Sequence, residues 1–142
     1  RLPADPYAAA KVREVLIYSE LHLELVARNL YPEAFFGGKV TDEVKERTHK
    51  LLLKGVHGFA KLAKFAPYVA GSEFTLADCA AVAHLPLVAS ASKIIYGEDV
   101  LAALPVRDYI KMMGERATMK TVNADRKSST EQMMALRAKK TG

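Results

Sequence analysis

The sequence predicts an all-α fold, and three observations support this prediction. Apolar side chains recur at helical spacing in several long segments, and no segment of useful length alternates as a strand would. Half of the 142 residues are hydrophobic, which is enough for one core. Residues 77–91 are apolar almost all round, which is typical of a buried helix. We therefore expect one domain, residues 1–142, built as a helical bundle around a central buried helix.

The first helix is predicted from its capping signals. Asp5 is a good N-cap and Pro6 suits the first helical position, so a helix should run to about Asn29, with Pro32 marking its exit. An inward face and a second apolar strip predict two packing partners for this helix. The face comprises Val12, Val15, Leu16, Ser19, Leu23, Val26 and Leu30, and the strip comprises Tyr18, Leu21 and Leu25.

The second helix should begin after a Thr41 cap and end at Pro67. Gly55 and Gly58 lower its helix propensity, so we expect another backbone to approach closely there. The expected inward stripe comprises Val44, Thr48, Leu51, Gly55, Phe59, Leu62 and Ala66.

The third helix is the most informative. Thr75 and Asp78 have the spacing of a capping box, in which each side chain accepts from the other residue's backbone N–H. Phe74 and Cys79 occupy the positions of a hydrophobic staple. Pro86 should bend the helix, because it removes one backbone hydrogen bond. We interpret Thr75 and Asp78 as a structural cap, and we expect the buried helix to be surrounded by the others.

Three further helices are expected. Pro105 should open the fourth, and Thr118 should cap a short helix that ends near Val122. Ser129 and Gln132 form another capping-box pattern, which predicts a last helix over residues 131–139. The side chains expected to point inward from the fourth helix are Val106, Tyr109, Ile110 and Met113.

Charge and cysteine usage restrict the function classes. The net charge is +5, but no aromatic residues interleave with the basic tail, so we do not expect nucleic-acid binding. No run approaches roughly 18 apolar residues, so no membrane span is expected. A single cysteine fits a reducing compartment, and we expect a cytoplasmic protein. The chain opens without Met, so we expect that it begins inside a longer protein or after processing. The tail comprises Arg126, Lys127, Arg137, Lys139 and Lys140.

Few residues suggest chemistry on their own. Cys79 has no cationic neighbour in sequence, so we interpret it as a small core residue rather than a nucleophile. Glu46-x-x-His49 is half of a di-iron signature without its second pair, so no metal site is expected. His22, His57 and His84 lie on separate helices without ligand spacing, and His84 is interpreted as a satisfied core histidine.

The segments around the third helix resemble a known family. Gly71 to Asp78 reads GSEFTLAD, and a Pro-started helix is followed by RATMKTV from Arg116 to Val122. This is similar to the C-terminal domain of bacterial glutathione transferases, whose central helix begins with a G-x-x-F/L-T/S-x-A-D segment. The opening LPADPY resembles the segment that links the family's two domains. Ala117 stands where the family usually has Pro, a difference confined to a helix junction.

The resemblance implies a parent enzyme of two domains. An N-terminal thioredoxin-like domain, absent from this chain, would bind the co-substrate glutathione and supply the activating Ser, Tyr or Cys. The present domain would line the pocket for a small apolar electrophile and contribute to a homodimer in a detoxification enzyme, and alone it should be inactive. The pocket candidates implied by position are Ile17, Glu20, Leu21, Glu24 and Leu87. Two alternatives remain open: the glutamates could be ordinary surface residues, and the leucines could be core residues. Tyr18 could face the partner domain.

Two other functions remain open. Helical domains of this kind also serve as non-catalytic assembly modules in translation factors and tRNA synthetases. A ligand-binding domain of a helical transcription regulator would need a helix-turn-helix, and the sequence shows none. What lies upstream separates the enzyme from the module, because the enzyme needs a thioredoxin-like domain with an activating residue.

Overall fold

The computed structural model describes residues 1–140, apart from the side chains of Arg137 and Lys140. The described residues form no strand, so the predicted all-α class is confirmed. The chain divides into two compact units, Arg1–Tyr109 and Ile110–Gly142. The helical segments in chain order are α1 (Pro6–Ser19), the π-helical η1 (Glu20–Glu24), α2 (Leu25–Ala27), the 3₁₀-helical η2 (Arg28–Leu30), α3 (Tyr31–Phe36), α4 (Asp42–Leu62), α5 (Leu76–Tyr96), α6 (Val106–Gly114) and α7 (Ala117–Lys140).

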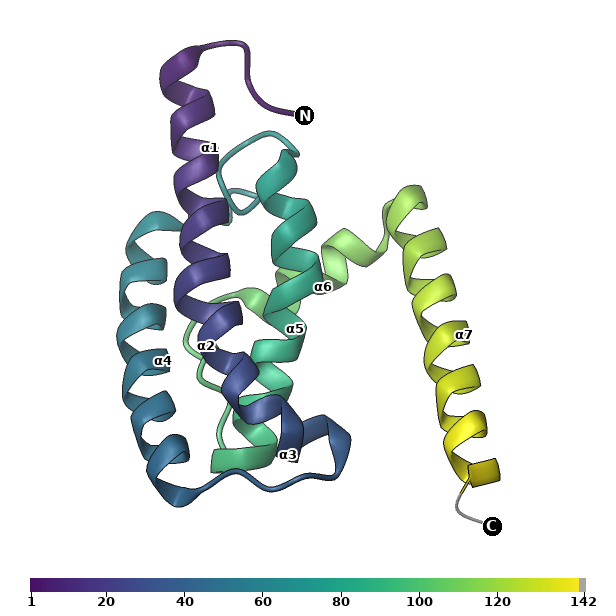
Figure 1. Cartoon of the computed structure of the whole chain (residues 1–142). Coiled ribbons are helices and arrows are strands. Elements are labelled where there is room, and N and C mark those ends of the chain that lie inside the picture. Colours follow the sequence, from purple (N-terminus) through teal and green to yellow (C-terminus); the bar gives the residue numbers. More distant parts are fainter. Residues whose placement is uncertain (141–142) are drawn as a thin grey trace. The chain divides into compact units, whose positions relative to one another are not determined.

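In the first unit, α1 and η1 pack against both α4 and α5 (Figure 1). These two helices are the packing partners that the sequence predicted for the first helix. The core between them contains large apolar side chains with no exposed surface. These include Leu23, Leu30, Leu52, Phe59 and Leu85.

The first helical segment is longer and less regular than predicted. Asp5 caps it as expected and accepts from the Ala8 N–H at 2.8 Å. The expected end at Asn29 is wrong, because the chain continues through η1, α2 and η2 into α3, which Gly37 closes at φ 72°. Pro32 does not end the segment because it lies in the first turn of α3, where its missing N–H is tolerated.

Helix α4 begins as predicted, with the Thr41 hydroxyl accepting from the Val44 N–H at 3.3 Å. It ends at Leu62, before Pro67, because Ala63 already has extended backbone angles. The inward stripe contains Leu52, which is fully buried, and Leu51 is exposed. Residues on one helix face follow one another at intervals of three or four positions, so a face that contains Thr48 and Phe59 also contains Leu52. The assignment of Leu51 to the inward stripe was therefore wrong.

The predicted close approach of another backbone is confirmed at Gly55, whereas a side chain, not a backbone, lies against Gly58. A Cβ atom on Gly55 would lie 2.3 Å from the backbone carbonyl oxygen of His22 in η1. The Tyr18 hydroxyl donates to the Gly55 carbonyl oxygen at 2.9 Å and lies where a Gly58 side chain would be. The absence of side chains at these two positions therefore sets the distance between α4 and the first helical segment.

The capping box of α5 is present, and its Asp78 does more than cap. The Asp78 carboxylate is fully buried and accepts from the Thr75 N–H at 2.8 Å. It also accepts from the Val69 N–H at 2.9 Å and from the Tyr109 hydroxyl at 2.6 Å. One carboxylate thus connects the preceding loop, the start of α5 and α6.

Helix α5 is not surrounded on all sides, which corrects the sequence prediction. Its inward side chains are buried, but its other face exposes apolar or small residues in the structure. Cys79 lies on this face and is exposed, so its interpretation as a core residue was wrong. The sequence pattern shows that α5 is apolar, but it does not show whether another element covers each side. The exposed face includes Leu76, Cys79, Leu87, Ser90 and Ile94.

By length and composition, α5 could also cross a membrane, which the sequence analysis did not anticipate. The most apolar window of this helix is 33% buried within the described structure. The core helix of a soluble protein meets the same criterion, so length and hydropathy alone do not assign α5 to a membrane.

The second unit contains most of α6 and the long helix α7. Two separate helices, ending near Val122 and restarting near residue 131, were predicted, and that prediction was wrong. Thr118 and Ser129, the predicted caps, both lie within α7. The Thr121 and Thr130 hydroxyls donate to carbonyl oxygens four residues earlier in this helix, at 3.3 and 2.9 Å. In the predicted basic tail, the side chains of Arg137 and Lys140 lie outside the described residues.

An ion pair between α3 and α4 should make stability sensitive to acid. Lys45 donates to the Glu33 carboxylate at 2.8 Å, the Val40 N–H donates at 3.2 Å, and both hold the pKa of Glu33 below its ordinary value. A lowered folded pKa gives stability at neutral pH that is lost as pH falls through that pKa. We expect that in Glu33→Gln the free energy of unfolding, measured by urea titration, falls less steeply with decreasing pH below about pH 5.

The exposed Glu46 supplies the control for this prediction, because it pairs with Lys50 within one helix. Glu46→Gln should leave the acid decline as it is in the parent chain. If Glu33→Gln and Glu46→Gln gave the same pH dependence as the parent, the role of the Glu33–Lys45 pair would be excluded.

Candidate functional site

The five predicted pocket residues lie on the first helical segment and on α5, and they differ in exposure. Ile17, Leu21 and Leu87 expose 48%, 51% and 42% of their surfaces, so the interpretation of the two leucines as core residues is wrong. Glu20 is half-exposed, whereas Glu24 is buried. Residues three and four apart share a helix face, so Ile17, Glu20, Leu21 and Glu24 follow one side of α1 and η1.

Glu24 is a buried carboxylate, contrary to the alternative that it is ordinary surface. Its side chain is 7% exposed and accepts from Arg28 Nε at 2.5 Å. Burying a charge is costly unless the charge is paired, and Arg28 supplies that pair one turn further along. The spacing from Glu24 to Arg28 is that of a favourable i, i+4 pair, a signal that is visible in the sequence.

His84 on α5 lies between the two glutamates. Its Nε2 is 3.9 Å from Glu20 Oε1, and its Nδ1 is 3.9 Å from Glu24 Oε1. Both distances exceed a hydrogen bond, so the two ring nitrogens are not satisfied by these carboxylates. The side chain is 23% exposed, and the prediction of a satisfied core histidine is therefore wrong.

Tyr31 lies near Glu24 and Arg28 and adds a phenol to this group of polar side chains. Its hydroxyl oxygen is buried and has no hydrogen-bond partner among the described residues. Burial and the nearby Glu24 charge raise the pKa of Tyr31 to about 12, and Arg28 opposes this rise. The phenol therefore keeps its proton at neutral pH. We call Glu20, Glu24, Arg28, Tyr31 and His84 the polar cluster.

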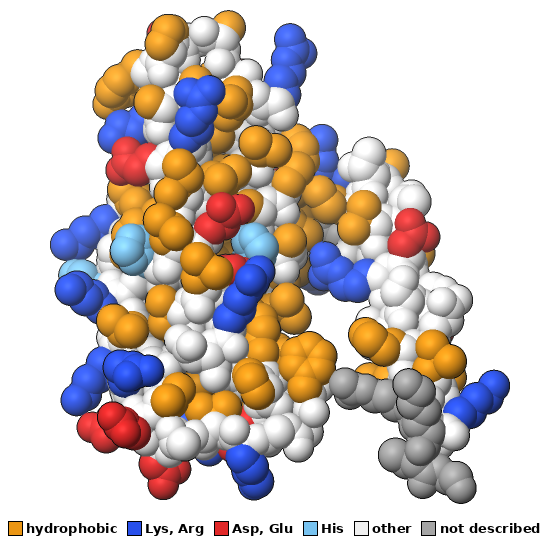
Figure 2. Space-filling view, in the orientation of Figure 1, with side chains coloured by type: hydrophobic (Ala, Val, Ile, Leu, Met, Phe, Trp, Pro, Cys, Tyr) orange, Lys and Arg blue, Asp and Glu red, His pale blue; other side chains and the backbone are white. Residues whose placement is uncertain are grey.

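The polar cluster lies within an apolar surface. Figure 2 shows acidic, basic and histidine side chains close together over the first helical segment and α5, surrounded by hydrophobic side chains. Residues 20 to 24 form the π-helical turn η1, and π-turns inside α-helices are frequent at functional sites. The arrangement can bind a small molecule through a few polar contacts beside an apolar wall.

Thr75 and Asp78 do not belong to this cluster. The buried Asp78 carboxylate is fully used as an acceptor for Val69, Thr75 and Tyr109. Burial and the hydrogen bond to Asp78 raise the pKa of Tyr109 well above its ordinary value. The capping box of Thr75 and Asp78 that the spacing predicted is present, and these contacts stabilise the start of α5.

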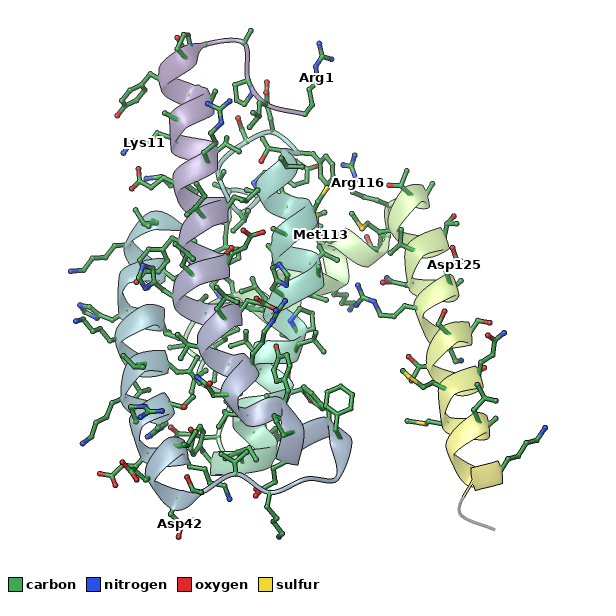
Figure 3. The ribbon with its side chains drawn as sticks, in the orientation of Figure 1. Arg1, Lys11, Asp42, Met113, Arg116 and Asp125 are labelled. Atoms are coloured by element: carbon green, nitrogen blue, oxygen red, sulfur yellow. The ribbon has the colours of Figure 1, made fainter. Side chains whose placement is uncertain are left out.

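A separate groove lies elsewhere in the first unit. It has a volume of about 560 Å³ and lies among the N-terminal part of α1, the end of α4 and the loop before α5. Apolar Val12 and Val15 line it together with three lysines, and none of the five predicted pocket residues does. Figure 3 shows one of these lysines, Lys11, projecting from α1 on the side away from α5. The lysines are Lys11, Lys61 and Lys64.

The remaining candidates have other partners. Glu46 pairs with Lys50 at 3.4 Å, and His49 lies 3.4 Å from Glu98 and stacks on Tyr96. Among the described residues, no group of three or more His, Cys, Asp or Glu side chains could hold a metal ion.

Comparison with known proteins places the chain. A curated glutathione S-transferase from Pseudomonas putida is 39% identical over 136 residues, which cover 95% of this chain and 62% of the relative. The crystal structure of Gtt2 from Saccharomyces cerevisiae matches with a TM-score of 0.58 at 22% identity, over 84% of this chain and 58% of that one. No protein-family model matches.

The capped central helix and the packing of α1, α4 and α5 define an all-helical domain of the glutathione transferase type. Over 95% of its length the chain is similar in sequence to the Pseudomonas protein, and by this similarity it resembles the glutathione transferase family. It spans about three fifths of the length of these two matches.

Proposed function

We propose that this chain is the substrate-pocket and dimerisation domain of a glutathione transferase that conjugates the glutathione thiolate to small apolar electrophiles. An N-terminal thioredoxin-like domain would bind glutathione and supply the thiol-activating residue, and the isolated chain would be inactive. The thiolate is the nucleophile in such a reaction, so activation requires a group that stabilises it. The enzyme would work in the cytoplasm as a homodimer in detoxification, without nucleic acid or membrane as a partner.

The uncovered apolar surface supports this proposal. Ile17 and Leu21 on the first segment and Leu87 on α5 are large, apolar and about half-exposed. Contiguous exposed apolar surface marks interfaces and ligand-binding sites in soluble proteins. One part of this surface would contact the thioredoxin-like domain, and the part around the polar cluster would hold the electrophile.

A conjugation assay on the protein as its native source expresses it tests the proposal. We expect an intact mass larger by about one small domain, on the order of 80 residues, and conjugation of glutathione to an aryl halide. Leu21→Ala should raise KM for the electrophile by several-fold, because truncation removes apolar contact with it. Leu136→Ala, at an exposed leucine on α7, is the matched control and should leave KM unchanged.

The alternative is a non-catalytic assembly module. An expressed protein no larger than this chain, with no conjugation activity, would favour the module and contradict the transferase. The same exposed surface would then bind a protein partner.

A further inference from the structure

We propose that the polar cluster recognises a protonated amino group on the second substrate. The preferred electrophiles would then carry an ammonium group on an apolar body. This inference rests on the proposed function, because it names the class of electrophile for the same surface.

The distances around His84 fit a bridging donor. Glu20 Oε1 and His84 Nε2 are 3.9 Å apart, which is too long for a direct hydrogen bond. A single nitrogen donor can lie at about 2.9 Å from both atoms, within ordinary hydrogen-bond distance. A primary ammonium has three N–H groups, so it can donate to the carboxylate and to the ring nitrogen at once.

The charge of the cluster favours a cation. The cluster contains two carboxylates and one guanidinium, and Arg28 is engaged with Glu24 at 2.5 Å. Apart from the His84 ring, the cluster therefore carries one negative charge, on Glu20, that no guanidinium or ammonium compensates. Among the described residues, Glu20 has no Lys or Arg within 4.0 Å. An ammonium would complete this ion pair, whereas an anionic ligand would be repelled by Glu20.

Stability gives no reason for polar groups to be buried at this place. Glu24 is 7% exposed, and a buried ion pair seldom stabilises a protein more than apolar side chains of similar size would. The Tyr31 hydroxyl is also buried beside Glu24 without a partner among the described residues. The buried ion pair and the Tyr31 hydroxyl both cost stability at the same place, and ligand recognition explains them better than packing does.

Apolar side chains define the rest of the ligand. Ile17 and Leu21 precede Glu24 on one face of the first segment, and Leu87 lies one turn after His84 on α5. All three are about half-exposed, so they can contact an aromatic or alkyl body attached to the amine. Figure 2 shows this combination of charged and hydrophobic side chains on one face.

Titration with matched probes tests the proposal on the 142-residue chain. Three probes of similar shape at pH 7 differ in charge: 2-phenylethylammonium, neutral 2-phenylethanol and anionic 3-phenylpropionate. NMR titration should show the ammonium binding about ten-fold more tightly than the propionate, as for a charge-assisted hydrogen bond. The ammonium should shift the His84 ring signals.

Two variants locate the effect. Glu20→Gln keeps the shape of the side chain and removes the charge, so it should weaken ammonium binding about ten-fold and leave phenylethanol binding unchanged. Glu14→Gln alters an exposed glutamate of α1 that pairs with Lys11, and it should change neither. Equal binding of the three probes, or equal effects of the two variants, would overturn the proposal. Tighter binding of glutathione itself at His84 would also overturn it, because the cluster would then serve the co-substrate.

Activity measurements separate this proposal from the proposed function. If the conjugating protein prefers an aryl halide bearing an ammonium group and Glu20→Gln removes the preference, both are supported. If conjugation is retained without any preference for the ammonium, the recognition site is excluded and the transferase stands. If no conjugation is found in the full protein, the proposed function and the assignment of the amine as a substrate both fail.

Discussion

Replacing Asp78 by alanine should cause the largest loss of stability of any single change considered for this chain. The buried carboxylate accepts from the Val69 and Thr75 N–H groups and from the Tyr109 hydroxyl, at 2.9, 2.8 and 2.6 Å. Its removal leaves three buried donors without an acceptor, each costing about 1–3 kcal/mol. We expect the unfolding free energy from urea titration to fall by about 4 kcal/mol.

Asp5→Ala is the matched control, because Asp5 also caps a helix but is exposed and accepts from one N–H. Loss of an N-cap of this kind costs about 1 kcal/mol. If Asp78→Ala prevents folding, Asp78→Asn keeps the shape and should show a smaller but measurable loss. A parent-like melting temperature for Asp78→Ala would contradict the role assigned to this carboxylate.

Gly55→Ala should be the second most damaging change, although alanine favours helices. The new Cβ atom would lie 2.3 Å from the His22 carbonyl oxygen, so α4 and the first helical segment must move apart. Such overpacking costs typically about 1–3 kcal/mol, occasionally more, and exceeds the gain in helix propensity of about 1 kcal/mol. We expect a net loss of about 2 kcal/mol in unfolding free energy, together with a weaker hydrogen bond from Tyr18 to residue 55.

Gly114→Ala provides the comparison within the same chain. A Cβ atom there would meet Asn123 at 3.8 Å, an ordinary contact, so the substitution should be neutral or slightly stabilising. Equal melting temperatures for Gly55→Ala and the parent chain would show that the two backbones are further apart than the structure gives. Gly58→Ala should be rescued in part by Tyr18→Phe, because the clash at that position is with the Tyr18 hydroxyl.

Local signals in the sequence predicted the helix starts well. Asp5, Thr41 and the Thr75–Asp78 pair each cap the helix that they were expected to cap. These contacts join residues three apart, so residue type and spacing are sufficient to identify them. The acceptor role of Asp78 toward Val69 and Tyr109 depends on tertiary structure, and spacing could not reveal it.

The ends of helices and the exposure of their faces were predicted less well, because both depend on neighbours that are distant in sequence. The residues around Ser129 satisfy a capping pattern, yet they continue α7, because a capping pattern is also compatible with the interior of a helix. Cys79 is apolar and lies on an apolar helix, and its exposure depends on which elements pack against α5. The π-helical turn at residues 20–24 left no signal in the hydrophobic spacing.

The candidate site was predicted in part. Glu20 and Glu24 were assigned to the pocket from their positions along the first helix, and the structure brings both to His84. His84 itself was interpreted as a core residue, because its distance in sequence from the glutamates hides their proximity. Tyr31 was not considered, since the helix was expected to end before it.

The uncovered face of α5 makes folding and docking separable by mutation. Leu85 and Val88 point inward and are fully buried, so polar substitutions there would destroy the core. Leu87 and Ile94 are exposed on the same helix, and polar substitutions there remove little buried surface from the described chain. A selection for abundance should therefore accept polar residues at positions 87 and 94 and reject them at 85 and 88. A selection for the proposed conjugation activity should reject them at all four positions.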